Sequence, residues 1–215
     1  MENKIALFKE LLLAENRKHN LVSRATIETD LDEHIEDSRR ILGIMKLKGQ
    51  KVVDIGSGAG FPGLILAICE PEAEFTLLES NQKKSRFLVE AAEKLRLKNT
   101  SVNNERAETA SRRHNQRGRF DIGVARAVAK VQVLLEYGLP LIKTRGRAVF
   151  WKGVNYPEEL SRAQNALNIL GGRLTAEHKY FTAAEKERVL LEFTKIKPTP
   201  DNYPRRTGIP AKNPL

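Results

Sequence analysis

A short apolar run that opens directly into a cluster of glycines sets the strongest limit on how this chain folds. Residues 52–55 (Val-Val-Asp-Ile) are typical of a buried strand, and four glycines follow between Gly56 and Gly63. Glycine lets the backbone turn tightly and approach a ligand, because no Cβ stands in the way. An apolar helical segment, residues 64–69, comes next. The pattern predicts a strand, a ligand-binding turn and a helix, as in an α/β sheet.

Further strand patterns recur along the chain and alternate with segments of helical periodicity. The last two expected strands are joined by the short polar segment 182–188, which is too short for a crossover helix, so they must be antiparallel neighbours. We therefore expect an α/β fold with a mostly parallel sheet and an antiparallel last strand. The other expected strands lie at 74–79, 100–103, 120–124, 148–151, 174–181 and 189–196.

The two ends of the chain differ from its middle. Residues 1–48 carry apolar side chains at helical spacing, which predicts a helical N-terminal extension. Residues 198–215 contain five of the nine prolines, which predicts a basic tail without helix or strand. The expected organisation is an extension at 1–48, a sheet domain at 49–197 and a tail at 198–215, all in one compact unit.

The charge of the chain is concentrated in its second half. The net charge is +10, and residues 101–215 hold 21 basic and 11 acidic side chains. A positive surface attracts polyanions, among which nucleic acid is prominent. No apolar run reaches the roughly 18 residues of a membrane span, Cys69 has no second cysteine to pair with, and no histidine or cysteine spacing suits a metal. We expect a cytoplasmic protein that neither spans a membrane nor binds a metal ion.

The glycine cluster fits two cofactors. Gly58-x-Gly60-x-x-Gly63 matches the dinucleotide fingerprint, and Glu79 follows Gly58 by 21 residues, about where that fold places an acid on the ribose. This pattern predicts an NAD-dependent oxidoreductase.

The second candidate is S-adenosylmethionine. Asp54 stands two residues before Gly56-x-Gly58-x-Gly60, an order typical of sites for this methyl donor. The antiparallel last strands and the positive charge also favour the methyl donor. Pro62 does so too, because it lacks an N–H group that a pyrophosphate would need.

The segment 54–64 (Asp-Ile-Gly-Ser-Gly-Ala-Gly-Phe-Pro-Gly-Leu) resembles the signature of the bacterial glucose-inhibited division protein B family, whose members are small-subunit ribosomal RNA guanine-N7 methyltransferases. The resemblance implies a Rossmann-like class I methyltransferase with a seven-stranded sheet, acting on N7 of a specific guanine in 16S rRNA. A non-catalytic RNA-binding or cell-division regulator stays open as an alternative. Shorter matches follow the same order at 20–23, 34–38, 78–88, 106–108, 120–127, 152–153 and 204–208.

The motif and the resemblance together predict the cofactor site. The expected positions lie at the carboxyl ends of strands, where α/β sheets bind ligands, and the resemblance implies that Glu79 holds the ribose hydroxyls. Guanine N7 carries a lone pair and no proton, so no catalytic acid or base is expected. The residues expected at S-adenosylmethionine are Asp54, Gly56, Ser57, Gly58, Gly60, Phe61, Glu79, Ala107, Glu108 and Arg126.

Basic residues in the N-terminal connector, after the fifth strand and in the tail are expected to contact RNA. We expect the tail to follow the phosphate backbone, so that deleting residues 199–215 weakens RNA binding and leaves cofactor binding intact. The four arginines at 112–119 are further candidates for RNA contact, although a solvated loop explains them equally well. The expected partner is 16S rRNA or the small ribosomal subunit, and no heptad pattern demands a dimer, so we expect a monomer. The predicted RNA contacts are Arg17, Lys18, Arg24, Lys152, Arg205, Arg206 and Lys212.

Overall fold

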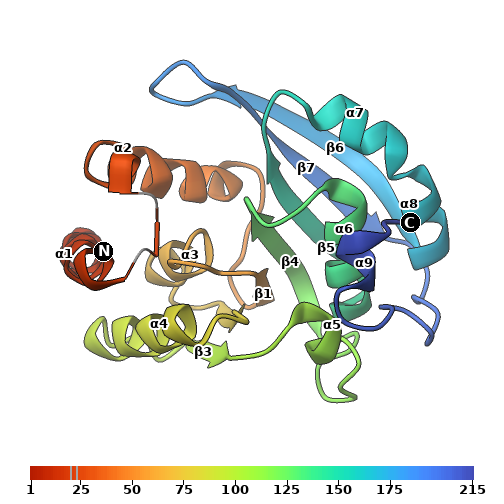
Figure 1. Cartoon of the computed structure of the whole chain (residues 1–215), viewed down its shortest axis with the longest axis horizontal. Coiled ribbons are helices and arrows are strands. Elements are labelled where there is room, and N and C mark those ends of the chain that lie inside the picture. The colour runs from red at the N-terminus through yellow and green to blue at the C-terminus, as the bar shows by residue number, and fades with distance from the viewer. Residues whose placement is uncertain (20, 23) are drawn as a thin grey trace.

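The computed structural model describes residues 1–19, 21–22 and 24–215, without the side chains of residues 24–29. Its strands are β1 (Lys51–Ile55), β2 (Glu74–Leu78), β3 (Thr100–Asn103), β4 (Phe120–Arg126), β5 (Ile142–Lys152), β6 (Gly172–Phe181) and β7 (Glu187–Lys195). They form one sheet in the order β3-β2-β1-β4-β5-β7-β6 (Figure 1). β7 runs antiparallel to both of its neighbours, and the pairs from β3 to β5 are parallel. The predicted mostly parallel sheet of seven strands with an antiparallel last strand is confirmed.

Burial explains why the strand patterns differ. Val52 and Val53 of the central strand β1 are fully buried, because helices cover both faces of a parallel sheet. β6 lies at the sheet edge, and its burial alternates along the strand because only one face is covered. β5 begins at Ile142 rather than at the predicted Ala148. Its first half is polar and pairs with β4 in irregular register, so this half contains no apolar run from which a strand could be predicted.

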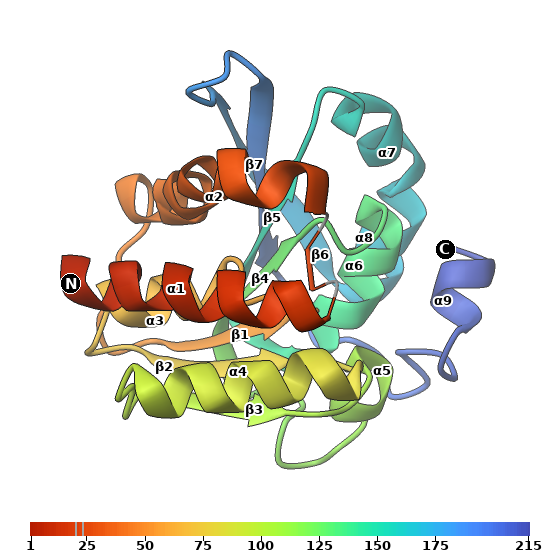
Figure 2. The same cartoon turned by 60° about the vertical axis from the view of Figure 1, so that its left-hand side comes forward.

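The helices form a layer on each face of the sheet (Figures 1 and 2). Two 3-10 turns, η1 (Arg40–Gly43) and η2 (Leu139–Leu141), connect them to strands. The helices are α1 (Glu2–Lys18), α2 (Arg24–Arg39), α3 (Gly63–Cys69), α4 (Gln82–Lys94), α5 (Ala107–Ala110), α6 (Val131–Gly138), α7 (Tyr156–Arg162), α8 (Gln164–Leu170) and α9 (Ile209–Lys212).

Two apolar cores lie on the two faces of the sheet. Phe8 of α1 is fully buried in the core that contains Val52 of β1 and the inner sides of α2, α3 and α4. Leu135 of α6 and Leu167 of α8 share the second core with Phe150 of β5. The N-terminal helices are therefore packed into the body of the molecule.

The N-terminal connector is shorter than the sequence predicts. α1 continues to Lys18, so Arg17 and Lys18 lie in its last turn. The side-chain oxygen of Asn16 accepts hydrogen bonds from the backbone N–H groups of Leu21 (2.8 Å) and Val22 (2.9 Å). This buried amide holds the chain where α1 ends.

The tail, predicted to lack helix, contains the short helix α9. Pro210 lies in its first turn, where the missing N–H group costs no helical hydrogen bond. A proline-rich segment can therefore still contain one helical turn. The proposed boundary at 48/49 falls between η1 and β1, and the boundary at 197/198 falls just after β7.

Candidate functional site

The turn after β1 is built from glycines in conformations that other residues avoid. Gly56, Gly58 and Gly60 have φ angles of +73°, +58° and +101°, in the left-handed region that favours glycine. The backbone N–H groups of Gly56 and Ser57 donate to the carbonyl of Leu78 at 2.8 and 3.0 Å. The loop is therefore fastened to the end of β2, at the carboxyl edge of the sheet.

Asp54 is fully buried beneath this glycine loop. Its Oδ2 accepts a hydrogen bond from the backbone N–H of Gly63 at 3.0 Å, whereas its Oδ1 has no partner among the described residues. A Cβ on Gly63 would lie 2.5 Å from Oδ2 of Asp54, so the close approach requires glycine. Burial raises the pKa of Asp54 to about 7. The loop thus covers an acidic group that keeps one acceptor atom unused.

Glu79 directly follows β2 and bridges two loops. Its Oε2 accepts from the backbone N–H of Gly58 at 2.8 Å, and its Oε1 accepts from that of Asn81 at 2.7 Å. A carboxylate oxygen has two lone pairs, so each oxygen of Glu79 retains capacity for one further donor. The position suits a group that also accepts from ribose hydroxyls.

The N-terminus of α3 is poorly suited to a pyrophosphate. Pro62 has no N–H group, the N–H of Gly63 donates to Asp54, and the N–H of Leu64 donates to the carbonyl of Gly60 at 2.9 Å. Phosphates bind helix N-termini through free backbone N–H groups, and these three positions offer none. The local geometry therefore argues against a dinucleotide.

Arg126, at the end of β4, is fixed by residues of α2. Its Nε lies 3.0 Å from Oδ2 of Asp37, and its Nη1 donates to the carbonyl of His34 (2.9 Å) and to Oγ of Ser38 (3.2 Å). Its Nη2 lies 2.6 Å from Nδ1 of His34. Because a guanidinium only donates, this histidine nitrogen must accept. Arg126 thus connects the N-terminal extension to the carboxyl edge of the sheet.

Phe61 joins the glycine loop to the same cluster. Its ring lies 5.6 Å from the guanidinium carbon of Arg126 and 5.6 Å from the ring of His34. On its other side it meets Phe8 of α1 edge to face at 5.5 Å. Burial, together with the charge of Arg126, lowers the pKa of His34. The predicted cofactor residues Phe61 and Arg126 are therefore brought into contact, and α1 and α2 support both.

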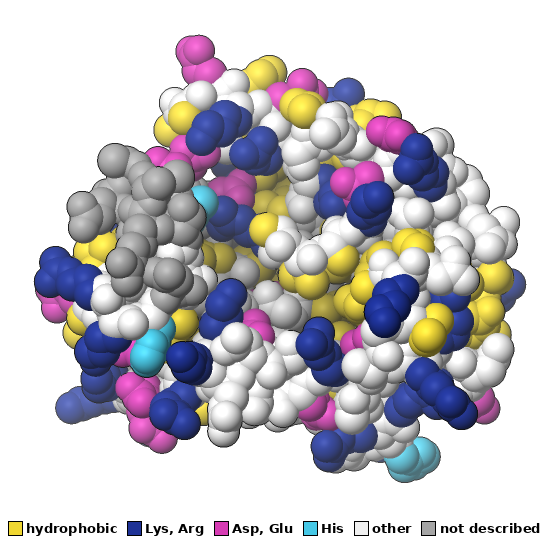
Figure 3. Space-filling view, in the orientation of Figure 1, with side chains coloured by type: hydrophobic (Ala, Val, Ile, Leu, Met, Phe, Trp, Pro, Cys, Tyr) yellow, Lys and Arg dark blue, Asp and Glu magenta, His cyan; other side chains and the backbone are white. Residues whose placement is uncertain are grey.

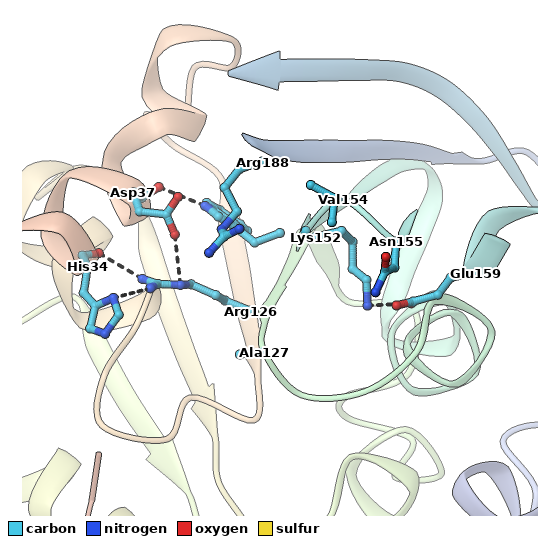
Figure 4. A pocket seen from close by; sticks show the side chains of 11 residues that line it. His34, Asp37, Arg126, Ala127, Lys152, Val154, Asn155, Glu159 and Arg188 are labelled. Carbon is cyan, nitrogen blue, oxygen red and sulfur yellow. Dashed lines mark hydrogen bonds and ion pairs between the residues drawn. The ribbon is translucent and has the colours of Figure 1, made fainter. Parts of the chain in front are cut away.

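A cavity of about 500 Å³ opens beside Arg126. In Figure 4, the side chains of His34 and Asp37 point toward Arg126 from one wall, while Lys152 and Glu159 meet on the other. Figure 3 shows that this face of the molecule is hollowed and that Lys and Arg side chains are spread around the hollow. The lining residues are His34, Asp37, Arg126, Ala127, Trp151, Lys152, Gly153, Val154, Asn155, Glu159 and Arg188.

The far wall of the cavity is also held in place by hydrogen bonds. Trp151 donates from Nε1 to the carbonyl of Asp37 at 2.8 Å. Lys152 Nζ lies 2.6 Å from Oε2 of Glu159 and donates to the carbonyl of Ala129 at 3.0 Å. The cavity therefore has polar walls that are fixed by hydrogen bonds and an ion pair.

Sequence reasoning missed several lining residues, among them Trp151, Asn155, Glu159 and Arg188. The half-buried Arg188 makes no ion pair with a described residue, and its Nη1 donates to the carbonyl of Glu187 at 3.1 Å. Arg188 stands near the start of a reversed strand, so it reaches the edge where the parallel strands end. The antiparallel direction of this strand, which the sequence predicts, was the signal from which Arg188 could have been placed at this edge.

The predicted cofactor residues of α5 face the tail as well as the sheet edge. Ala107 and Glu108 begin this helix shortly after β3 ends, and both are buried. Oε1 of Glu108 accepts a hydrogen bond from the backbone N–H of Gly208 at 2.9 Å. The carboxylate of Glu108 is therefore engaged by the tail.

Among the expected RNA contacts whose side chains are described, Lys152 alone lines the cavity. Arg17 and Lys18 lie exposed at the end of α1, with Lys18 3.2 Å from Glu15. The side chain of Arg24 lies outside the described part of the chain, as do residues 20 and 23 of the family pattern. Arg17 and Lys18, the two whose side chains are described, therefore do not extend the cavity wall.

The tail residues are divided between two roles. Arg205 forms an ion pair with the fully buried Glu136 at 2.7 Å, so its guanidinium is committed inside the protein. Arg206 and Lys212 are exposed. The segment 112–119, expected to be a solvated loop, instead supplies two arginines that donate to backbone carbonyls of the tail. Much of the positive charge at this end therefore serves internal contacts.

Among the described residues, no helix is both long and apolar enough to cross a membrane. Within the same residues, no group of three or more His, Cys, Asp or Glu side chains is arranged to hold a metal ion.

Comparison with known proteins points to one family. The model of the GidB family, described as rRNA small subunit methyltransferase G, matches residues 1–189. A protein named ribosomal RNA small subunit methyltransferase G from Syntrophomonas wolfei is 50% identical over 100% of both chains. One of the same name from Carboxydothermus hydrogenoformans is 40% identical over 100% of this chain and 93% of its own.

The fold also resembles solved structures. The crystal structure of M. jannaschii TYW2 in complex with AdoMet superposes with a TM-score of 0.59 at 19% sequence identity, and the match covers 76% of this chain and 77% of that one. A similarity at this level of identity concerns the fold alone. The sheet is that of the Rossmann-like class I S-adenosylmethionine-dependent methyltransferases.

Proposed function

The chain belongs to the GidB family of rRNA small subunit methyltransferases, and we propose that it transfers a methyl group from S-adenosylmethionine to N7 of a specific guanine in 16S rRNA. The observation that carries this proposal is that the glycine loop and the cavity adjoin. A Cβ on Gly56 would lie 2.8 Å from the side chain of Val128, whose neighbour Ala127 lines the cavity. A cofactor on the loop and a base in the cavity would thus meet near Arg126.

The residues of the glycine loop fit the cofactor. The unused Oδ1 of buried Asp54 and the remaining acceptor capacity of Glu79 suit a ligand that carries positive charge and hydroxyl groups. When bound, S-adenosylmethionine supplies a methyl group on a sulfonium centre. In this proposal the glycine loop holds its charged end above the buried carboxylate of Asp54, Glu79 holds the ribose, and Ala107 and Glu108 form a further wall.

The cavity fits a single base drawn out of the RNA. Its volume of about 500 Å³ lies within the range of about 300 to 1,000 Å³ found for small-ligand pockets. Arg188 lines the cavity without an ion pair to a described residue, so it offers positive charge to a phosphate. Enzymes that modify a base inside folded nucleic acid bind it in such pockets.

Positioning, rather than proton transfer, is the task of the side chains. Guanine N7 has a free lone pair, so no base is needed to create the nucleophile. His34 accepts a hydrogen bond from Arg126 at Nδ1 and serves to hold this arginine. A wall fixed in this way can orient the base toward the methyl donor and exclude water. Orientation of this kind can lower the activation free energy by several kcal/mol. We name no catalytic acid or base.

The proposal includes the setting of the reaction. The substrate is 16S rRNA, free or within the small subunit, and the chain acts as a monomer in the cytoplasm. The domain division at 48/49 and 197/198 describes parts of one unit, since the extension and the tail both contact the sheet domain.

The test is methyl transfer from labelled S-adenosylmethionine to 16S rRNA that lacks its normal modifications. Borohydride and aniline treatment then breaks the RNA chain at N7-methylguanine, and a single new break is expected. Label without a break would show that the methyl group is transferred to an atom other than guanine N7. No label on RNA or on small subunits, with a thermal shift caused by NAD instead, would support the oxidoreductase alternative. No label and no shift with either cofactor would support a non-catalytic RNA-binding protein.

A further inference from the structure

The tail, residues 198–215, is seated on the protein beside α5 and α6 (Figure 1). Two arginines that follow α5 hold the tail through its backbone carbonyls. Arg112 donates to the carbonyl of Pro204 at 2.5 Å, and Arg117 donates to that of Tyr203 at 2.7 Å. These contacts join a segment after β3 to residues more than 80 positions later.

An ion pair locks the middle of the tail onto α6. Arg205 donates from its backbone N–H and from Nε to Oε1 of Glu136 at 2.7 and 2.9 Å, and from Nη2 to Oε2 at 2.7 Å. Glu136 is 0% exposed. Its carboxylate is therefore satisfied by one residue of the tail, and removal of that partner would leave a buried charge unpaired.

Beyond this ion pair, the tail reaches the proposed cofactor wall. The backbone N–H of Gly208 donates to Oε1 of Glu108 at 2.9 Å, and Glu108 is 3% exposed. α5 has only four residues, and a helix of that length is not stable without tertiary contacts. The position of α5 therefore depends on the groups that hold it, among which the tail is prominent.

We propose that the tail is a positioning strap for the cofactor site. Arg205 and Glu136 hold the tail, Gly208 holds Glu108, and α5 is thereby kept in place as one wall around S-adenosylmethionine. This inference rests on the proposed function, which places Ala107 and Glu108 at the cofactor. It replaces the expectation that removal of the tail leaves cofactor binding intact.

The direct test is the affinity of Arg205→Ala for S-adenosylmethionine, measured by calorimetry without RNA. We expect it to fall about tenfold, because α5 loses its support. At saturating cofactor the kcat should stay near that of the parent, so that the KM for the cofactor rises. Arg205→Lys, which keeps a positive charge for Glu136, should recover most of the affinity.

A matched control separates positioning from general stability. Asn99 stands just before β3, at the amino ends of the parallel strands, and its side-chain amide donates to the carbonyls of Ala67, Glu70 and Ala73 at 3.1 to 3.2 Å. Asn99→Ala should lower the Tm yet bind the cofactor like the parent. If Arg205→Ala does the same, the proposal is overturned.

Two further results are informative. If Arg205→Ala does not fold, the double variant Arg205→Ala, Glu136→Leu leaves no buried charge unpaired and removes every hydrogen bond between residues 205 and 136, and the same loss of affinity is expected of it. Unchanged affinity in that double variant would overturn the strap. Failure of the proposed function would look different, since the parent itself would then not bind S-adenosylmethionine, and this would overturn both proposals.

Discussion

At the scale of single residues, Asp54 combines two properties that are rarely found together. It is fully buried, and one of its oxygens lacks a partner among the described residues. Burial raises its pKa to about 7, and the nearby charge of Glu79 acts in the same direction, while Arg126 acts against it. A positively charged ligand would favour the ionised form. We therefore expect Asp54 to link cofactor binding to pH.

We predict opposite effects of pH on stability and on affinity at Asp54. Between its usual pKa of 3.8 and about 7 the folded chain keeps a proton that the unfolded chain releases. The free energy of unfolding therefore falls as the pH rises through this range, relative to that of Asp54→Asn. The affinity for S-adenosylmethionine should rise through pH 7 in the parent and stay flat in the variant. Urea denaturation and calorimetry at pH 5 to 8 measure both, and parallel profiles for the two proteins would refute the prediction.

At the scale of elements, the N-terminal helices support the glycine loop and Arg126. α2 contributes three residues to the fixation of Arg126, and Trp151 of β5 donates to the backbone of the same helix. α1 meets Phe61 of the loop through the fully buried Phe8. The sequence predicts these helices as an extension, whereas in the structure α2 lines the cavity and α1 packs against the glycine loop.

We predict that Phe8→Ala weakens both the fold and the loop. Truncation of a buried Phe to Ala typically costs about 3 to 5 kcal/mol, and the ring of Phe61 loses its edge-to-face partner. Urea denaturation should show the lower stability, and calorimetry should show weaker cofactor binding at a temperature where the variant is folded. Glu10→Ala, at an exposed position of the same helix, is expected to change stability by less than about 0.5 kcal/mol. Equal behaviour of the two variants would contradict this role of α1.

At the scale of the whole molecule, the net charge of +10 overstates the positive charge that is available to RNA. Arg112, Arg117 and Arg205 hold the tail, and Arg126 is bound to α2. Arg188 differs, because it lines the cavity without an ion pair to a described residue. Position in the fold, rather than total charge, selects the cations that can meet a phosphate.

We predict that Arg188→Ala weakens RNA binding and leaves the affinity for S-adenosylmethionine unchanged. Loss of one phosphate contact should reduce the slope of log affinity against log salt by about 1. Filter binding at several salt concentrations measures this slope. Arg173→Ala is the matched control, since Arg173 is exposed at the other end of the β6–β7 hairpin. An equal change in both variants would show that the effect comes from the overall charge and not from a phosphate contact of Arg188.

The sequence by itself determined the sheet and the glycine loop of this protein. Strand and helix periodicity, the glycines at 56, 58 and 60 and the acids Asp54 and Glu79 are local signals, because neighbouring residues along the chain decide them. Their expected places at the carboxyl edge of the sheet agree with the structure. Local patterns suffice where the backbone itself forms the feature.

Only the tertiary structure decided the partners of the charged side chains. Arg126 meets His34 from 92 positions away, Arg205 meets Glu136 from 69 and Gly208 meets Glu108 from 100. No periodicity encodes such pairs, because they form when packing of the apolar cores brings distant segments together. For the same reason an arginine in a proline-rich tail looked available to RNA in the sequence, although in the folded chain a buried carboxylate holds it.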